Sequence, residues 1–140
     1  MNRRSLCICL VFALLLALAG CSGNHRSDQR ADTDPLIPAK PIAEIIVSTL
    51  PRSDEFAFTD ADSMNRIVDY FNSLHLLGEY TEGESTLAGM IWVVKLFFDD
   101  GSSLTIWHSG NRFVRTEGGP CYQISYKEAS RFQTLMDRLS

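Results

Sequence analysis

The sequence contains none of the short motifs that usually mark an enzyme. There is no Gly-x-Ser-x-Gly elbow for a nucleophilic serine, no His-Glu-x-x-His zinc motif and no glycine-rich phosphate loop. We therefore predict no catalytic residue, no metal site and no cofactor. The pattern favours a non-enzymatic protein.

An excess of cationic residues is also missing. The 140 residues include 13 Lys and Arg against 17 Asp and Glu, which gives a formal net charge of −4. Nucleic acids and anionic lipid surfaces attract proteins through clustered Lys and Arg. We therefore expect no nucleic-acid partner and no adhesion to anionic lipid through a basic patch.

Long hydrophobic runs are absent except near the N-terminus. The apolar run Leu6–Leu18 has 13 residues, whereas a membrane-spanning helix needs about 20. Arg3 and Arg4 precede the run and small residues follow it, which is the pattern of an export signal. We expect residues 1–20 to be a signal peptide.

The end of this run carries a more specific motif. Leu18-Ala19-Gly20-Cys21 resembles the lipobox of bacterial lipoproteins. The resemblance implies that the chain is cut before Cys21 and that its thiol receives a diacylglyceryl group, with at least two acyl chains in all. Two acyl chains hold a protein stably on a bilayer. An uncleaved signal anchor and an ordinary secretory signal are the alternatives.

The lipid anchor would place the protein on the extracytoplasmic face of a bacterial cell membrane. Ser22 stands where some lipoproteins have an aspartate that retains them in the inner membrane. In a host with two membranes, the outer membrane is therefore the expected location. The partners predicted are the membrane, through the anchor, and a protein.

Cysteine becomes scarce once the signal is removed. Cys7 and Cys9 leave with residues 1–20 and Cys21 is used by the lipid, so Cys121 remains alone. No intrachain disulfide can then form, and the domain must be stabilised by its core. We expect Cys121 to be a small buried hydrophobic residue rather than a nucleophile.

The remaining chain divides into a tether and one domain. Residues 21–41 are polar and rich in proline near their end, without helical or strand periodicity, which predicts a flexible tether. Residues 42–140 are predicted to form one globular domain. It begins with an interior strand at Ile42–Leu50, which Pro51 ends.

Two helices are predicted from capping patterns and apolar periodicity. Thr59 followed by Asp62 resembles a capping box and begins the first helix; Ser125 and Glu128 form a full capping box before the second. The apolar stripes are Met64, Ile67, Val68, Phe71 and Leu74 in the first helix and Ala129, Phe132, Leu135, Met136 and Leu139 in the second, with Arg131 and Arg138 facing outward.

The segment between the helices predicts an antiparallel meander. Its first part, Gly78–Gly89, is a polar loop, and Asp99-Asp100-Gly101 is typical of a hairpin turn. Strands are expected at residues 90–98, 102–108, 112–117 and 121–124. The predicted fold class is α+β: an antiparallel sheet of four to five strands with two helices packed on one face, as a two-layer sandwich.

The sheet face away from the helices is the candidate binding surface. Leu104 and Ile106 alternate with Thr105 and Trp107, so the latter two are predicted to point away from the helices, with Arg115 of the next strand near Trp107. Tryptophan beside arginine is typical of protein-binding anchors. Alternatively, the Gly78–Gly89 loop covers Trp107.

A second hypothesis assigns the chain a small ligand, a metal or an unrecognised hydrolase activity. His75, His108 and Cys121 are suitable zinc ligands if the fold brings them together. The loop carboxylates Glu79, Glu82 and Glu84 are suitable for a hard cation, although their spacing does not match an EF-hand.

The domain resembles small lipoprotein domains of unknown function that are common in Gram-positive bacteria. The resemblance lies in residues 42–49, 59–60, 97–101, 122–125 and 135–139. It implies the α+β architecture and the membrane anchor. It implies no catalytic residue.

Overall fold

The computed structural model describes residues 34–80, 89–110 and 112–140. Their secondary structure consists of seven strands and two helices. In chain order these are β1 (Ile42–Leu50), β2 (Glu55–Phe58), α2 (Ala61–Asn72), β3 (Gly78–Tyr80), β4 (Ile91–Phe98), β5 (Ser103–Ser109), β6 (Phe113–Thr116), β7 (Cys121–Gln123) and α3 (Tyr126–Leu139).

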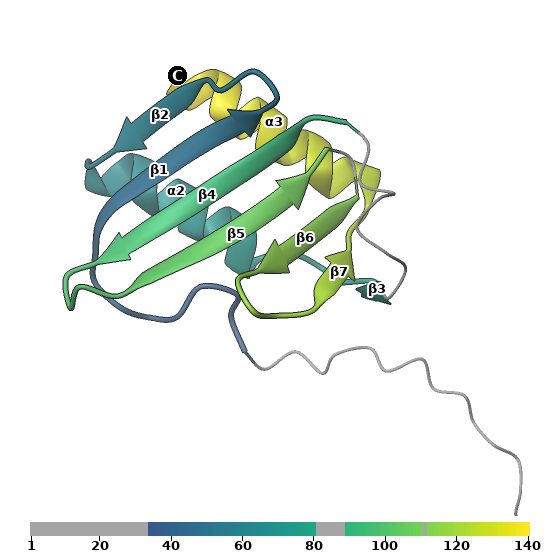
Figure 1. Cartoon of the computed structure of the whole chain (residues 1–140), viewed down its shortest axis with the longest axis horizontal. Helices are drawn as coiled ribbons and strands as arrows, with labels where there is room; N and C mark the ends of the chain where they lie inside the picture. Colours follow the sequence, from purple (N-terminus) through teal and green to yellow (C-terminus); the bar gives the residue numbers. More distant parts are fainter. Residues whose placement is uncertain (1–33, 81–88, 111) are drawn as a thin grey trace, which may run out of the picture.

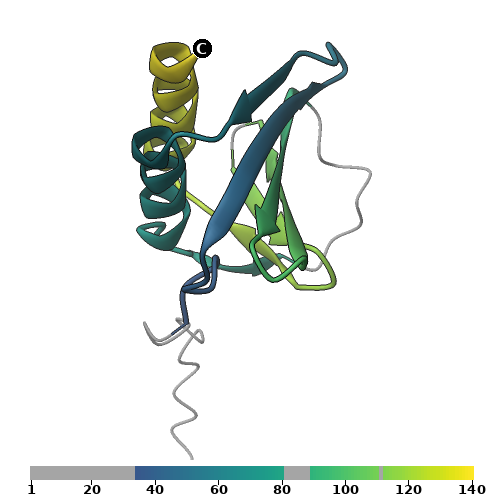
Figure 2. The same cartoon turned by 90° about the vertical axis from the view of Figure 1, so that its left-hand side faces the viewer.

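All seven strands belong to one sheet, in the order β2-β1-β4-β5-β6-β7-β3, and every neighbouring pair is antiparallel. Figure 1 shows this order across the sheet, and Figure 2 shows both helices on the same side of it. The predicted α+β class with an antiparallel sheet and helices on one face is confirmed.

The predicted number of four to five strands is wrong. The two additional strands, β2 and β3, have four and three residues and lie at the two edges of the sheet. Strands this short contain too few residues for an alternating pattern. The segment predicted as a loop from Gly78 therefore begins as a strand, paired with β7, while residues 81–88 lie outside the described residues.

The centre of the sheet forms where the sequence predicted it. β1 lies between β2 and β4, which confirms its predicted interior position. The Asp99-Asp100-Gly101 turn joins β4 to β5, and Gly101 has a φ of 81°, a conformation that glycine adopts at little cost.

The core fills the space between the sheet and the helices. The helices contribute Ile67, Tyr70 and Phe71 from α2 and Ala129, Phe132 and Met136 from α3. The Phe132 side chain is fully buried, and its ring lies 4.9 to 5.6 Å from the rings of four other residues, measured between centroids. Phe132 is therefore the point at which the two helices and the sheet meet.

The two helix starts are capped differently. Ser125 and Glu128 form the predicted capping box of α3. The predicted cap of α2 at Thr59 is wrong by one residue: Asp60 has the extended backbone of an N-cap, and its carboxylate accepts a hydrogen bond from the Ser63 amide at 2.9 Å. A carboxylate satisfies a free helix amide as well as a hydroxyl does, so two adjacent capping residues compete.

The packed domain also begins before the predicted boundary at Ile42. Leu36 packs against the core and Ile37 is buried. The Asn72 side chain, at the end of α2, accepts a hydrogen bond from the Ile37 amide at 2.8 Å and donates one to its carbonyl at 3.1 Å. Residues 36 and 37 therefore belong to the domain and not to a tether.

The predictions for residues 1–33, including the signal peptide, Cys21 and most of the tether, lie outside the described residues. Within residues 34–80, 89–110 and 112–140, neither helix has the length and apolar character needed to cross a bilayer.

Candidate functional site

The face of the sheet opposite the helices, here called the open face, carries apolar side chains. No described helix or strand packs on this face (Figure 2). Its apolar residues lie on β1, β4, β5 and β6. Along each strand they alternate with the core residues, and their side chains are half-buried. They are Ile46, Ile91, Val93, Phe97, Trp107 and Phe113.

Trp107 and Arg115 lie together on the open face, as predicted. They are directly opposite each other in the register of β5 and β6, and the Arg115 guanidinium lies 5.0 Å from the centre of the Trp107 ring. A guanidinium over an indole face is attracted by the negative charge of the ring face. Thr105 lies two residues away on the same strand face.

A second cation lies over an aromatic ring on the same face. The Lys95 ammonium is 4.9 Å from the centre of the Phe97 ring, and the Lys95 side chain is exposed. The open face therefore combines two aromatic rings, each with a cation on its face, with branched aliphatic residues beside them. Aromatic residues and arginine are enriched in protein interfaces, and the polar rim of an interface can accommodate a lysine.

Cys121 also lies on the open face, because it is opposite Arg115 in the register of β6 and β7. Its side chain is half-buried. Burial raises the pKa of the thiol, and the positive charge of Arg115 opposes this rise. The thiol is therefore protonated at neutral pH and poorly suited to act as a nucleophile.

His108 lies on the other face, buried between the sheet and the helices. Its ring stacks on Phe132 with 4.9 Å between centroids, and its Nε2 is 2.9 Å from the Tyr70 hydroxyl. That hydroxyl also lies 3.0 Å from the Glu128 carbonyl oxygen, to which it donates. Nε2 therefore carries the proton and donates to Tyr70, while Nδ1 has no partner among the described residues.

The environment of His108 keeps the imidazole neutral. Burial lowers the pKa of His108 to about 4 and raises the pKa of the Tyr70 phenol above its usual value. A neutral histidine hydrogen-bonded to a buried tyrosine is a structural pair in the core. Both side chains are buried.

The zinc site considered from the sequence is not formed. His108 and Cys121 lie on opposite faces of the sheet, and the His75 side chain is exposed beyond the end of α2. No group of three or more potential metal ligands occurs in the described ranges. For the proposed cation site, Glu79 is exposed on β3, and Glu82 and Glu84 lie outside the described residues.

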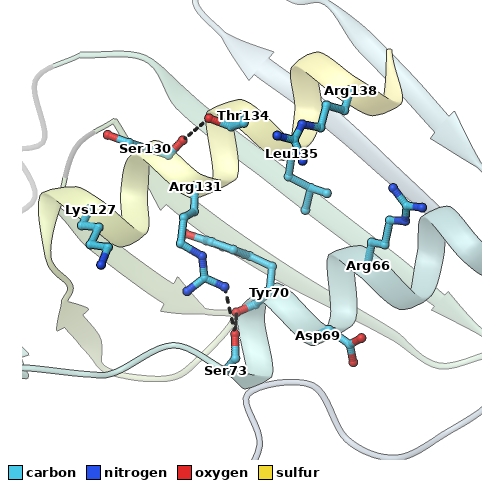
Figure 3. Close-up of a pocket in the computed structure, with 10 residues that line it drawn as sticks. All are labelled: Arg66, Asp69, Tyr70, Ser73, Lys127, Ser130, Arg131, Thr134, Leu135 and Arg138. Atoms are coloured by element: carbon cyan, nitrogen blue, oxygen red, sulfur yellow. Dashed lines mark hydrogen bonds between the residues drawn. The ribbon is translucent and has the colours of Figure 1, made fainter.

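A groove between the two helices was not predicted from the sequence. It has a volume of about 620 Å³ and lies between α2 and α3, with Tyr70 on its floor (Figure 3). Lys127, Arg131 and Arg138 line it from α3. Their spacing of four and seven residues places them on one face of a helix, a signal that the sequence already contained.

Comparisons of the chain with protein-family models, with curated proteins and with solved structures found no match.

Proposed function

We propose that this protein is a lipid-anchored, non-enzymatic binding module on the extracytoplasmic surface of a bacterial membrane, and that it captures a protein partner through the open face. The observation that carries the proposal is the apolar open face with Arg115 stacked on Trp107. The anchor rests on the resemblance of residues 18–21 to a lipobox.

The open face has the chemistry of a contact surface. Contiguous apolar patches are uncommon on monomeric proteins unless they bind something. Burying the exposed part of such side chains contributes about 25 cal/mol per Å² of apolar area. Tryptophan and arginine are also the residue types that most often dominate the binding free energy of an interface.

The cations on this face define the partner more closely. Lys95 is exposed and has no carboxylate within ion-pair distance among the described residues. The complementary surface is therefore a protein surface of apolar side chains with a carboxylate at its border. Charge complementarity of this kind speeds association and favours one orientation.

The anchor supports this function by concentrating the module where its partner is. A protein held at a membrane meets other membrane proteins at a high effective concentration, so a weak contact becomes sufficient for capture. The high effective concentration requires lipidation of Cys21, so substitution of Cys21 abolishes it.

Photo-crosslinking in cells tests the proposal. A photoreactive amino acid at position 105 of the full-length chain, in place of Thr105, reports contacts of the open face, and mass spectrometry identifies what is bound. Trp107→Ala is expected to reduce the crosslinked product at least ~10-fold, since anchor residues of interfaces commonly contribute 2 kcal/mol or more.

Tyr126→Ala is the matched control, because it removes an exposed aromatic ring on the helix side of the domain. It should leave the crosslinked product unchanged. Cys21→Ser should reduce the product while the domain stays folded. An equal crosslinked yield from the wild type and Trp107→Ala would contradict binding through the open face.

A further inference from the structure

The groove between α2 and α3 has a different chemistry from the open face. Four cationic side chains and one carboxylate line it, together with hydroxyl groups and one apolar side chain (Figure 3). The lining residues are Arg66, Asp69, Tyr70, Ser73, Lys127, Ser130, Arg131, Thr134, Leu135 and Arg138. This local excess of positive charge contrasts with the net negative charge of the whole chain.

Three of the four cations form no ion pair within the described residues. Arg66 forms an ion pair with Asp62, with 3.0 Å between nitrogen and oxygen. Lys127, Arg131 and Arg138 have no carboxylate within 4.0 Å in the described part of the chain. All three side chains are exposed, so they are available to an anion from solution.

The three free cations form a row along α3. With a rise of 1.5 Å per residue, their Cα atoms are separated by about 6 Å and about 10.5 Å along the helix axis. The hydroxyl groups of Ser130 and Thr134 lie on the same wall of the groove, and Thr134 donates to the Ser130 carbonyl at 3.0 Å. The α3 wall therefore carries a line of cationic N–H donors with hydroxyl groups beside them.

The floor of the groove holds the central cation in place. The Arg131 guanidinium lies 5.7 Å from the centre of the Tyr70 ring, and one of its nitrogens is 3.5 Å from the Ser73 hydroxyl oxygen. The Tyr70 hydroxyl is used by His108 and Glu128. Tyr70 is thus a rigid platform, and Arg131 presents its remaining N–H groups to the groove.

The α2 wall restricts where an anion can sit. Asp69 lines the groove from α2, and its negative charge repels an anion on that side. The favourable position is therefore along α3, at Arg131, with Lys127 on one side and Arg138 on the other. Guanidinium and ammonium groups are common partners of phosphate oxygens.

We propose that the groove between α2 and α3 binds a phosphorylated anion along α3, with Arg131 at the centre of the site and Lys127 and Arg138 on either side of it. The phosphate belongs either to a soluble phosphorylated ligand or to the headgroup of an anionic lipid, and both offer the same tetrahedral oxygens. This site lies on the opposite side of the sheet from the open face, so the proposal does not depend on the proposed protein partner.

Titration of the full-length protein in a neutral detergent tests this site. One arm uses inorganic pyrophosphate, and the other uses micelles containing phosphatidylglycerol, with phosphatidylcholine as the zwitterionic control. Binding is measured by calorimetry at low ionic strength, where exposed charges are least screened. We expect binding in at least one arm, and the arm that binds identifies the source of the phosphate.

Two triple variants with the same change of net charge make the test specific. Lys127→Gln, Arg131→Gln and Arg138→Gln together should raise the dissociation constant at least ~10-fold, because each removes a charge-assisted contact. Lys40→Gln, Arg52→Gln and Arg112→Gln together remove three positive charges outside the groove and should change the constant less than about twofold.

The outcomes separate this proposal from general electrostatic attraction. A melting curve first confirms that both triple variants are folded. Absence of binding in both arms would overturn the proposal, and so would equal losses of affinity in the two triple variants. Loss confined to the groove variant supports it, whether or not Trp107→Ala affects protein capture.

Discussion

The two faces of the sheet are built from alternating residues of the same strands, yet they have different properties. On the covered face, Ile45, Val94 and Ile106 are completely buried. On the open face, their neighbours Ile46, Val93 and Trp107 are half-buried, and cations lie over two aromatic rings. Each strand thus supplies one set of residues to the core and the other set to a partly exposed surface, and the position of the helices decides which set is buried.

The largest expected difference between the faces is in stability. Phe132→Ala, on the covered side, should lower the free energy of unfolding by about 3 to 5 kcal/mol, because it leaves a cavity among four aromatic rings. Trp107→Ala should cost less, about 2 kcal/mol, since part of the indole remains exposed to solvent in the folded protein. Urea denaturation measures both. Similar losses for the two variants would show that the open face is part of the core.

The next largest expected effect is a dependence of stability on pH, which comes from a histidine on the covered face. The pKa of His108 is about 4 in the folded protein and about 6.5 ordinarily. The unfolded chain therefore binds the proton more readily, and stability falls as the pH drops from about 6.5 to about 4. The full loss is about 3 kcal/mol. Above pH 6.5 this contribution is constant.

Substitution of His108 isolates this contribution. In His108→Phe, the free energy of unfolding should lose this part of its pH dependence, and Tyr70 keeps its bond to the Glu128 carbonyl. His75→Gln, which changes an exposed histidine, should keep the wild-type dependence. An unchanged pH profile in His108→Phe would mean that His108 is accessible to protons in the folded state.

The smallest expected change in stability comes from the segment that precedes β1. Asn72→Ala removes two hydrogen bonds to the backbone of Ile37 and should lower the free energy of unfolding by about 1 to 2 kcal/mol. Hydrogen exchange of the Ile37 amide should become faster. Asn65→Ala, an exposed asparagine on the same helix, is the control and should leave both quantities unchanged. Unchanged exchange at Ile37 in Asn72→Ala would contradict the docking of this segment.

The parts of the fold that were predicted correctly are those indicated by several residues close together in the sequence. β1, β4 and β5 have seven to nine residues each, enough to show the apolar pattern of a strand, and the capping box of α3 is a local motif. The juxtaposition of Trp107 and Arg115 followed from strand alternation and a short turn, which is why it could be predicted.

The features that were missed depend on contacts between distant segments. β2 is stabilised by its pairing with the nine-residue strand β1, and β3 by its pairing with the three-residue strand β7, rather than by their own composition. Ile37 is buried because Asn72, 35 residues away, holds its backbone. The groove forms because α2 and α3 lie side by side. Its cations were not apparent from the net charge, because that sum also includes the acidic residues elsewhere in the chain.

The attachment of Ile37 to Asn72 also determines how the domain carries a mechanical load. A pull on the chain before Leu36 is applied first to these two hydrogen bonds, so they must break before the force reaches β1. After they break, a force directed along β1 shears its pairing with β4, which extends from Ile42 to Leu50. The bonds of that ladder then share the tension and resist together, rather than opening one at a time.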